Sequence, residues 1–327
     1  MYFRCVFLLA VAVARSAFPQ NIRRITHRDG LSNSSILSLA QDADGYIWAG
    51  SCDGLNLWDG NSARNFRFSG NLIQEIVATD DGYLWVRTNY GVDRFDTRDR
   101  RIEMLAGFQR VYKFAARSRD EAFFLHGNKL YGYVASKGAF EPVDVRGAEL
   151  TGVLRMCLDG DGALWLVRSG DIRCAQVAYD ADGRASVGEW ERMTMPDGVV
   201  FTRYDGDRTI FFTDRNGMLF RFDTEQRRAF PIFDLREELG RRGALSSVIS
   251  DKDDYVLAFG MSGVLRLRST DPIEGRYELQ EIDVNCGVFA LLKDCNQDIV
   301  WIGTDGSGLL RQAVGEVAIR SVTCPTC

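Results

Sequence analysis

The sequence predicts an all-β protein, a seven-bladed β-propeller with four-stranded antiparallel blades. Short apolar runs separated by Asp-Gly turns, which are typical of hairpin strands, recur along most of the 327 residues. A large aromatic or apolar residue also returns in the second strand of each unit, at intervals of about 37 to 46 residues. Leucine-rich, ankyrin and tetratricopeptide arrays need a shorter period or a helix in every unit. The observed period, with about four strands in it, is that of propeller blades.

Residues 1–16 have the pattern of a secretory signal peptide. Arg4 precedes an apolar run over residues 5–13, and small residues follow up to Ser16. A charged start, a short apolar segment and a small-residue cleavage zone are the three parts of such a signal. The run is far shorter than the roughly 20 apolar residues that a membrane helix needs. We therefore expect export, with residues 17–327 forming a single propeller.

The first unit shows the repeat in full. The apolar run 36–40 predicts the innermost strand, the turn 42–45 follows, and residues 46–50 form the aromatic strand. Asp53-Gly54 then turns the chain into the third strand, because Asp-Gly supplies the positive φ that tight hairpins require. Each sheet has two apolar faces that it cannot bury alone, so sheets stacked around an axis cover one another. The recurring tryptophan, Trp48 in this unit, is therefore expected to pack between blades.

Six further units repeat this order. Unit three has the weakest pattern, and unit four extends into a long outer hairpin at residues 180–188. The first strand, residues 22–26, is expected to pair with the last blade and close the ring, although residues 317–322 compete for that position. The positions equivalent to the first tryptophan are, from unit one to unit seven, Trp48, Trp85, Phe123, Trp165, Phe211, Leu257 and Trp301.

Charge and cysteine content exclude some functions. The formal net charge is -5, whereas a sequence-independent nucleic-acid binder needs a net basic face to neutralise phosphates, so nucleic acid is not an expected partner. Of the eight cysteines, Cys5 would leave with the signal, and the remaining seven cannot all pair internally. Cys324 and Cys327 have the CxxC spacing of redox and zinc sites, but neither a βαβ context nor a second pair accompanies them. A terminal disulfide or two free thiols is favoured, and the overall disulfide pattern stays open.

The sequence contains no recognisable catalytic constellation. Histidine occurs only at His27 and His126, and there is no HExxH, GxSxG or phosphate-binding glycine loop. The later ligands of an EF-hand do not follow the acidic turns, so capping of the turn backbone is their expected role. We predict no catalysis by this region, no cofactor and no metal site. The carboxylate pairs in the turns are Asp42/Asp44, Asp80/Asp81, Asp159/Asp161 and Asp180/Asp182.

Residues 25–60 resemble the opening repeat of the two-component regulator propellers. Four features of that repeat occur together: the DGLSN start, the acidic turn, the W-x-G strand and the LN-x-aromatic-DG end. Units one, two, four and seven match the pattern well, and units three, five and six match it weakly. Such propellers form the periplasmic sensor region of hybrid two-component regulators in gut Bacteroidetes.

The resemblance implies a periplasmic sensor of carbohydrate breakdown products that controls genes for polysaccharide use. In full-length members, which are anchored in the inner membrane, a second propeller, an immunoglobulin-like domain, a membrane helix, a histidine kinase and a DNA-binding domain follow. The chain is then expected to be the first propeller of a longer sensor. The expected partners are an oligosaccharide, the downstream sensor domains and a second copy in a homodimer. The alternatives are a stand-alone protein-interaction platform and a propeller lyase or hydrolase with acid and base groups in its central funnel.

Propeller geometry predicts where a ligand would bind. The loop into each blade and the loop between its second and third strands are expected at the same end of the ring. Arginines gather there in units three to five, and the planar guanidinium suits bidentate recognition of acidic groups. The hypothesis is a basic rim, formed by the arginines with His126, that binds a carboxylated or sulfated oligosaccharide; the alternative is that these arginines are solvated or paired with Asp205, Asp207 and Asp214. The predicted ligand-binding residues are Asn89, Tyr90, Arg110, His126, Arg168, Arg203, Arg215 and Asp305.

Overall fold

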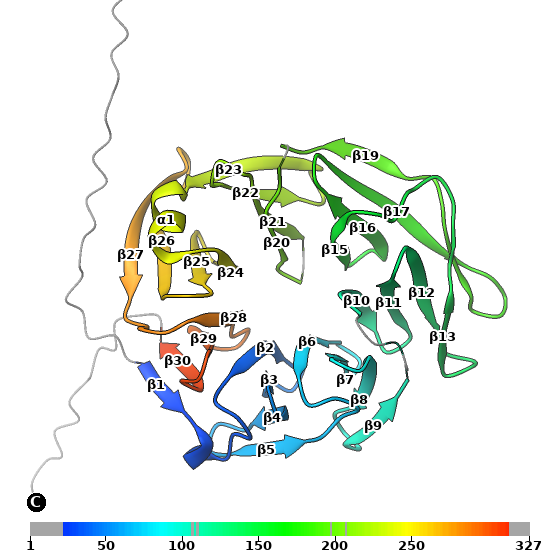
Figure 1. The fold of residues 1–327 in the computed structure, drawn as a ribbon, viewed down its shortest axis with the longest axis horizontal. Coiled ribbons are helices and arrows are strands. Elements are labelled where there is room, and N and C mark those ends of the chain that lie inside the picture. Colours follow the sequence, from blue (N-terminus) through cyan, green and yellow to red (C-terminus); the bar gives the residue numbers. More distant parts are fainter. Residues whose placement is uncertain (1–21, 106–107, 109–110, 197, 207, 314–327) are drawn as a thin grey trace, which may run out of the picture.

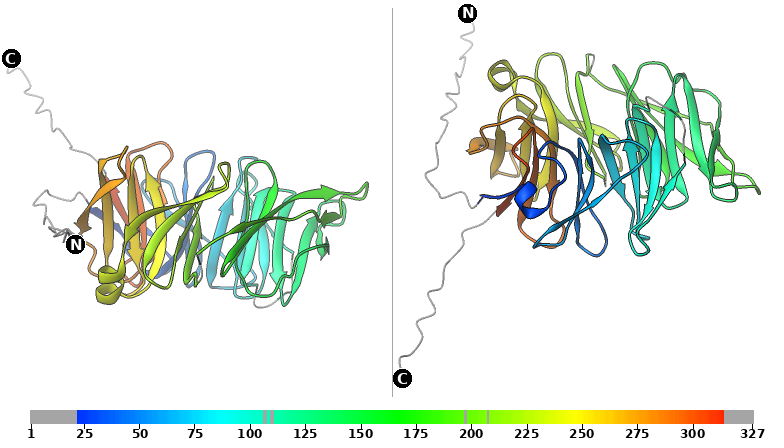
Figure 2. Two further views of the ribbon diagram at one scale, coloured as in Figure 1. Left: turned by 90° about the horizontal axis from the view of Figure 1, so that it is seen from above. Right: turned by 60° about the horizontal axis from the view of Figure 1, so that its bottom comes forward.

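The computed structural model describes residues 22–105, 108, 111–196, 198–206 and 208–313. Seven mainly antiparallel sheets stand around a common axis, and one strand of each sheet lies nearest to it (Figure 1). The side view in Figure 2 shows the strands running along the short dimension of a disc. The predicted all-β, seven-bladed propeller is therefore confirmed. The proposed signal peptide, residues 1–16, lies outside the described residues.

Blades 1 to 3 and 5 to 6 each have four strands, which are ordered from the axis outward. Blade 1 contains β2 (Ile36–Gln41), β3 (Ile47–Ser51), β4 (Gly54–Trp58) and β5 (Ala63–Phe66). Blade 2 contains β6 (Ile73–Ala78), β7 (Tyr83–Thr88), β8 (Val92–Asp96) and β9 (Arg101–Met104). Blade 3 contains β10 (Lys113–Ser118), β11 (Glu121–His126), β12 (Lys129–Val134) and β13 (Ala139–Pro142). Blade 5 contains β20 (Phe201–Tyr204), β21 (Thr209–Thr213), β22 (Met218–Asp223) and β23 (Arg228–Asp234), and blade 6 contains β24 (Leu245–Asp251), β25 (Asp254–Phe259), β26 (Val264–Asp271) and β27 (Arg276–Ile282).

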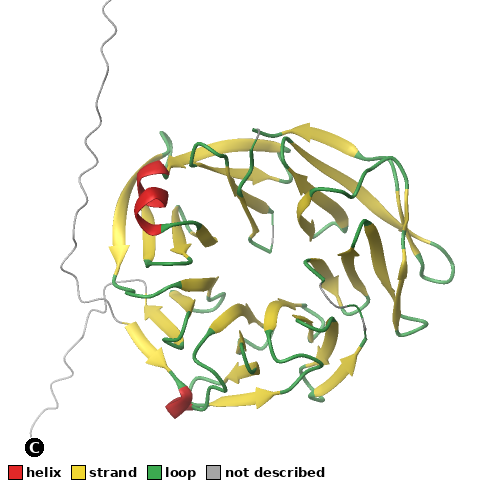
Figure 3. Ribbon diagram, viewed as in Figure 1, coloured by secondary structure: helices red, strands yellow, loops and turns green. Residues whose placement is uncertain are grey.

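Blade 4 departs from this plan at its outer edge. Its first three strands are β15 (Val153–Leu158), β16 (Ala163–Arg168) and the long β17 (Asp171–Tyr179). The first half of β17 pairs with β19 (Glu191–Thr194), and its second half pairs with β18 (Ala185–Val187), which in turn pairs with β14 (Asp144–Val145). The long outer hairpin expected in unit four thus becomes a second small sheet. Helical structure in the described residues is confined to a 3-10 turn, η1 (His27–Asp29), and α1 (Arg236–Arg242) (Figure 3). None of the described helices has the length and apolar character of a membrane span.

The ring closes between blade 7 and the start of the chain. Blade 7 contains β28 (Val288–Lys293), β29 (Ile299–Thr304) and β30 (Leu309–Ala313), and its outermost strand is β1 (Ile22–Ile25). Strand β1 runs antiparallel to β30 and places Ile25 opposite Leu309. The predicted closure by the first strand is confirmed, while the competing segment 317–322 lies outside the described residues.

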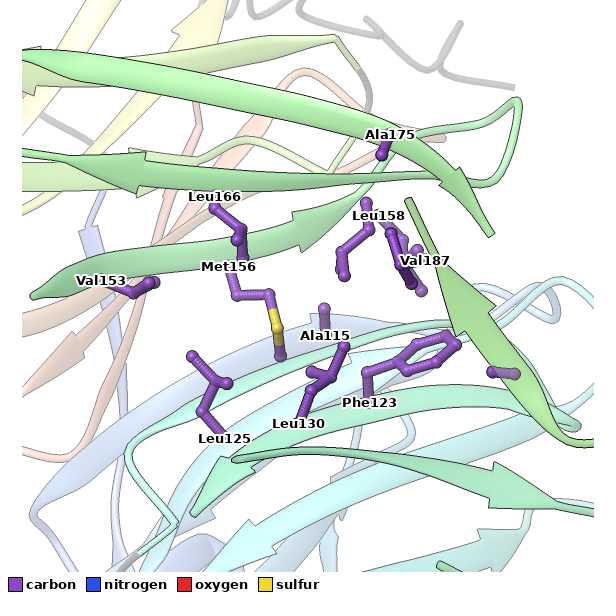
Figure 4. Close-up of a cluster of buried hydrophobic side chains, with 12 residues drawn as sticks. Ala115, Phe123, Leu125, Leu130, Val153, Met156, Leu158, Leu166, Ala175 and Val187 are labelled. Carbon is purple, nitrogen blue, oxygen red and sulfur yellow. The ribbon is translucent and has the colours of Figure 1, made fainter. Parts of the chain in front are cut away.

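Seven hydrophobic clusters fill the seven spaces between neighbouring blades. Trp48 of blade 1, for example, is 1% exposed and packs against Leu84 and Phe95 of blade 2. Figure 4 shows the cluster between blades 3 and 4, where Met156 of blade 4 points toward Ala115 of blade 3. The expected packing of the repeated tryptophan between blades is confirmed, because burial of both faces of each sheet holds the ring together.

One position in the predicted repeat is wrong. Leu257 of β25 packs in the cluster with Phe211 of blade 5, on the face opposite to that used by the tryptophans. Val256 occupies the tryptophan position instead, since it lies opposite Ile249 and packs toward blade 7. Successive residues of a strand point to opposite faces, so a shift of one residue reverses the side that is buried.

The acidic turns support the tryptophans directly. The indole Nε1 of Trp48 donates a hydrogen bond to Asp42 Oδ2 at 2.7 Å, and Trp165 makes the same bond to Asp159 at 2.7 Å. The other oxygen of Asp159 accepts the backbone N–H groups of Asp161 and Ala163 at 3.0 and 2.9 Å. The predicted turn-capping role is therefore confirmed for Asp42, Asp159 and Asp180, and Asp42 and Asp159 also hold the indole of the next strand.

The five cysteines within the described residues are free thiols: Cys52, Cys157, Cys174, Cys286 and Cys295. Cys157 and Cys174 are buried, and burial raises the pKa of both thiols. They behave as small apolar core residues. Cys324 and Cys327, for which a terminal disulfide or free thiols were expected, lie outside the described residues.

Candidate functional site

The two predicted classes of loop share one end of the ring, which we call the top face. It is the end where every innermost strand begins. There, turns between second and third strands contact the loops that lead into blades: Gly54 N–H donates to Asn71 O at 2.8 Å, and Asp305 N–H donates to Gly287 O at 2.8 Å. The acidic turns that follow the innermost strands lie at the other end, the bottom face. The side chains of the top-face loops are the candidate ligand-binding surface.

In blades 2 and 3, the top face carries three of the predicted residues. Asn89 lies in the turn between β7 and β8, where its Oδ1 accepts the backbone N–H of Leu72 at 3.2 Å. Its neighbour Tyr90 is 52% exposed. His126 ends β11 with its ring centroid 5.3 Å from that of Phe108, and its buried Nδ1 has no hydrogen-bond partner within the described chain. Tyr90 is thus available to a ligand, whereas Asn89 has a structural hydrogen bond. Arg110, also predicted for this site, lies outside the described residues.

In blades 4 and 5, Arg168 and Arg215 lie on the top face as predicted. Arg168 ends β16, and its Nη2 is 3.9 Å from Glu149 Oε2, a loose ion pair whose acidic partner is 68% exposed. Arg215 is exposed in the turn between β21 and β22, above Gly198. Asp214 is not its partner, because that carboxylate accepts the backbone N–H groups of its own turn. Both guanidinium groups therefore keep donors free for an acidic ligand.

Asp305, the last of the predicted residues, lies in the turn between β29 and β30 and accepts a hydrogen bond from Ser35 Oγ at 3.2 Å. Burial and then the negative charge of Asp305 raise the pKa of the nearby Cys52 thiol. Asp305 lies in blade 7, three blades from Arg168 and two blades from Arg215, so the predicted residues are not all brought into one pocket.

The predicted placement of Arg203 on the rim is wrong. The loop into blade 5 ends at Val200, whose N–H donates to Thr213 O at 3.0 Å, and β20 begins at the next residue. Arg203 is the third residue of this strand, opposite Phe211, and precedes the bottom-face turn by one residue. The charged end of Arg203 interacts with Arg155 and Glu75 from other blades instead. The placement of Arg203 thus depends on where β20 begins, and not on which residues the preceding loop contains.

The sequence-based prediction missed an exposed aromatic residue. Tyr112 is 66% exposed in the loop into blade 3, because β10 begins only at Lys113. Val200 and Met261, in top-face loops of blades 5 and 6, are 69% and 80% exposed. An aromatic residue directly before the innermost strand of unit three, where the repeat pattern is weakest, was the signal that could have identified Tyr112. With Tyr90, it adds aromatic surface to the top face beside the arginines.

A second group of charged side chains, which we call the axial cluster, comes from the innermost strands of blades 2 to 5 and from the neighbouring strand β7, which supplies Arg87. Its members are Glu75, Arg87, Lys113, Arg155 and Arg203. Arg155 Nη1 of blade 4 is 3.1 Å from Glu75 Oε1 of blade 2, and its Nη2 is 3.4 Å from Thr202 O of blade 5. Blades 2 and 4 are not neighbours, so this ion pair reaches across the axial side of blade 3. Arg87 Nε contacts the other oxygen of Glu75 at 3.0 Å.

Electrostatics in the axial cluster favour negative charge. Burial alone would raise the pKa of Glu75, but Arg155 and Arg87 outweigh it and lower that pKa, so the carboxylate is ionised. Burial, helped by Arg155 and Arg87, lowers the pKa of Lys113. Burial, followed by repulsion from Arg155, lowers the pKa of Arg203 to about 10. Both shifts mean that positive charge is crowded and poorly hydrated here.

A cleft of about 410 Å3 at the bottom face, between blades 4 and 5, is a weaker candidate. Five of its charged lining side chains already have partners: Glu225 pairs with Arg208 at 2.5 Å, Glu191 pairs with Arg227, and Asp159 holds Trp165. These contacts explain the cleft as blade packing. Across the described residues, no group of His, Cys, Asp and Glu side chains is arranged to hold a metal ion.

Comparison with known families agrees with the first-blade geometry. Residues 30–53, which run from the turn after η1 to the top-face turn of blade 1, match the family model of the two component regulator propeller. Blade 1 carries a two-component regulator propeller repeat. The resemblance noted in the sequence is thereby confirmed, and it rests on the same acidic turn and W-x-G strand that hold Trp48 in place.

Solved structures show the same fold. The extracellular domain of BT3049 from B. thetaiotaomicron, described as a hybrid two component system, matches with a TM-score of 0.63 and 17% identity over 90% of this chain and 42% of that one. The corresponding domain of BT4673 matches with a TM-score of 0.66 and 19% identity over 90% of this chain and 40% of that one. The WD40 repeats of RRP9 match with a TM-score of 0.65 and 13% identity over 94% of this chain and 100% of that one.

The chain thus spans about two fifths of the length of the two B. thetaiotaomicron domains. At these identities the likeness shows the propeller fold alone. Comparison with curated protein sequences finds no match. The regulator-propeller repeat of blade 1, together with the shared fold, is the basis for a functional proposal.

Proposed function

We propose that this chain is an exported ligand-sensing propeller of a two-component regulator and that its top face binds a carboxylated or sulfated oligosaccharide. The observation that carries the sensor role is the regulator-propeller repeat of blade 1. The ligand class is supported by the top face, where Arg168 and Arg215 have free donors and Tyr90 and Tyr112 are exposed. In this proposal the propeller works in the periplasm without catalysis, and downstream domains pass its ligand state to genes for polysaccharide use.

The chemistry of these side chains suits an acidic sugar. A guanidinium offers two parallel N–H donors that match a carboxylate or sulfate, and such bonds are roughly twice as strong as neutral ones. Aromatic rings present a rigid apolar face on which the C–H face of a pyranose can pack. The four side chains come from the neighbouring blades 2 to 5, so a chain of several sugars could contact more than one of them.

Isothermal titration calorimetry with oligogalacturonates and with chondroitin sulfate fragments tests the proposal, and neutral xylo-oligosaccharides are the comparison ligand. We expect an acidic oligosaccharide to bind, and the double substitution Arg168→Ala with Arg215→Ala to raise its Kd about tenfold or more. Arg64→Ala, which removes an exposed arginine from the outer strand of blade 1, is the matched control and should leave the Kd unchanged. Acidic ligands that bind no better than neutral ones, or a double variant with unchanged Kd, would overturn the ligand assignment.

A further inference from the structure

The charges of the axial cluster are not required by the propeller fold. Strand register identifies one equivalent residue in each innermost strand. This residue pairs with the second-strand residue that follows the tryptophan position by two places. Four of the seven residues there are small or apolar and neutral, and the three charged ones come from the consecutive blades 2, 3 and 4. In blade order they are Ser38, Glu75, Lys113, Arg155, Phe201, Ser247 and Ala290.

Arg203 is likewise a charged residue at a position where the other blades have small or apolar residues. It lies opposite the tryptophan position itself, where every other blade has a small or apolar residue that helps to fill the space between sheets. A guanidinium at this depth loses hydration, as the lowered pKa of Arg203 reflects. No packing role accounts for it. The residues at this position are Ala40, Val77, Ala115, Cys157, Arg203, Ile249 and Leu292.

The axial cluster has fewer negative than positive groups. Its two contacts to Glu75 use Arg87 and Arg155. Lys113 and Arg203 form no ion pair in the described part of the chain; Glu75 acts on both at longer range, and Asp205 of the exposed bottom-face turn also acts on Arg203. Four positive groups of this cluster thus share the single carboxylate of Glu75, so one more negative charge would be stabilised there.

We propose that the axial cluster is a binding site for a small oxyanion, with Lys113 and Arg203 as its direct ligands and Arg155 as the third donor. The chemistry specifies an anion with at least two oxygens, either a free sulfate or the carboxylate of a sugar acid, because guanidinium and ammonium donors approach it from blades 3, 4 and 5. Glu75 already pairs with Arg155 and Arg87, so it competes with the anion for the Arg155 guanidinium. This site is separate from the top-face oligosaccharide site, so either proposal can fail without the other.

The test measures the thermal midpoint of the whole chain with increasing sodium sulfate, against sodium chloride at matched ionic strength. A ligand that binds only the folded state raises the midpoint. We expect millimolar sulfate, well below the concentrations at which sulfate stabilises folded proteins in general, to raise it further than chloride does. Sodium glucuronate and glucose form the second arm: a shift with glucuronate but not glucose assigns the site to a sugar acid, and a shift with sulfate alone assigns it to the inorganic ion. No specific shift with either anion overturns the proposal.

Two substitutions of opposite sign separate binding from structure. Arg203→Leu removes a crowded charge where blade 6 has Ile249, so without anion the variant should melt at or above the wild-type midpoint, while its anion-dependent shift should disappear. Glu75→Gln removes the competing carboxylate and should lower the Kd for the anion severalfold. Arg64→Leu, on the exposed outer strand of blade 1, is the control for loss of one positive charge. An Arg203→Leu variant that keeps the full anion shift, or a Glu75→Gln variant that folds and binds more weakly, contradicts the proposal.

Discussion

The seam that closes the ring depends on one carboxylate, and Asp294→Asn tests how much it contributes. Asp294 is 4% exposed in the turn between β28 and β29. Its Oδ2 accepts Trp301 Nε1 at 2.9 Å, and its Oδ1 accepts the N–H groups of Asn296 and Gln297 at 2.9 and 3.0 Å. Gln41 of blade 1 adds a fourth bond at 3.2 Å across the seam. One side chain thus links a turn, an indole and the neighbouring blade.

The expected loss follows from this geometry. In Asp294→Asn, one oxygen remains for the backbone donors, but the new amide group faces the buried Trp301 N–H with a donor. An unsatisfied buried donor costs about 1–3 kcal/mol, and the remaining bonds lose their charge assistance. We expect the variant to lose about 3 kcal/mol of unfolding free energy, which lowers Tm by roughly 4 °C for a chain of this size. Asp44→Asn, which changes an exposed carboxylate in the equivalent turn of blade 1, is the control.

The pH dependence provides a second measurement of the same interaction. Burial alone would raise the pKa of Asp294, but the bonds from Trp301, the turn backbone and Gln41 outweigh it and lower that pKa below 3.8. A carboxyl with a lowered pKa in the folded state stabilises the protein fully above its unfolded value, and this contribution disappears as pH falls through the folded value. The difference in Tm between wild type and variant, followed by circular dichroism, should therefore be largest near neutral pH and shrink below about pH 4. Equal midpoints at pH 7, or a gap that does not change with pH, would refute the reasoning.

Two further substitutions test how the blades meet. Gly50→Ala should lose about 2 kcal/mol of unfolding free energy, because a Cβ there would lie 2.5 Å from Ile73 Cγ2 of blade 2. Gly160→Ala, with open space around it, is the control and should fold with wild-type stability. Equal urea midpoints for the two variants would argue against this close approach. Ile25→Ala should lose about 3 kcal/mol in urea unfolding, since Ile25 is 0% exposed in the closing strand. Arg24→Ala, exposed on the same strand, should have little effect, and a similarly small loss for Ile25→Ala would show that β1 does not hold the ring closed.

Local patterns were sufficient to predict the blades. Asp42 and Trp48 lie six residues apart and form one hydrogen-bonded unit, so the pattern records a contact within a single hairpin. The same unit recurs with Asp159 and Trp165. Where this unit is absent, as in blade 6, the pattern could not distinguish Val256 from Leu257, because both are apolar and both are buried.

Candidate site residues were predicted less well, for a related reason. Arg168 and Arg215 follow clear strands, and the turns that hold them could be located from those strands. The position of Arg203 depends on where a short strand begins, and its role depends on Arg155 and Glu75, which are 48 and 128 residues away in the sequence. Contacts of that separation leave no local periodicity in a single sequence.

By itself, the sequence determined the number of blades, the acidic turns with their tryptophans, and the use of the first strand to complete the last sheet. Each of these follows from short-range hydrogen bonding or from the need to bury both apolar faces of a sheet. Only the tertiary structure decided which face each strand residue presents, which top-face side chains stay exposed, and that Glu75, Lys113, Arg155 and Arg203 meet near the axis. The physical reason is that ring closure brings non-neighbouring blades together, and charge interacts across that space irrespective of distance along the chain.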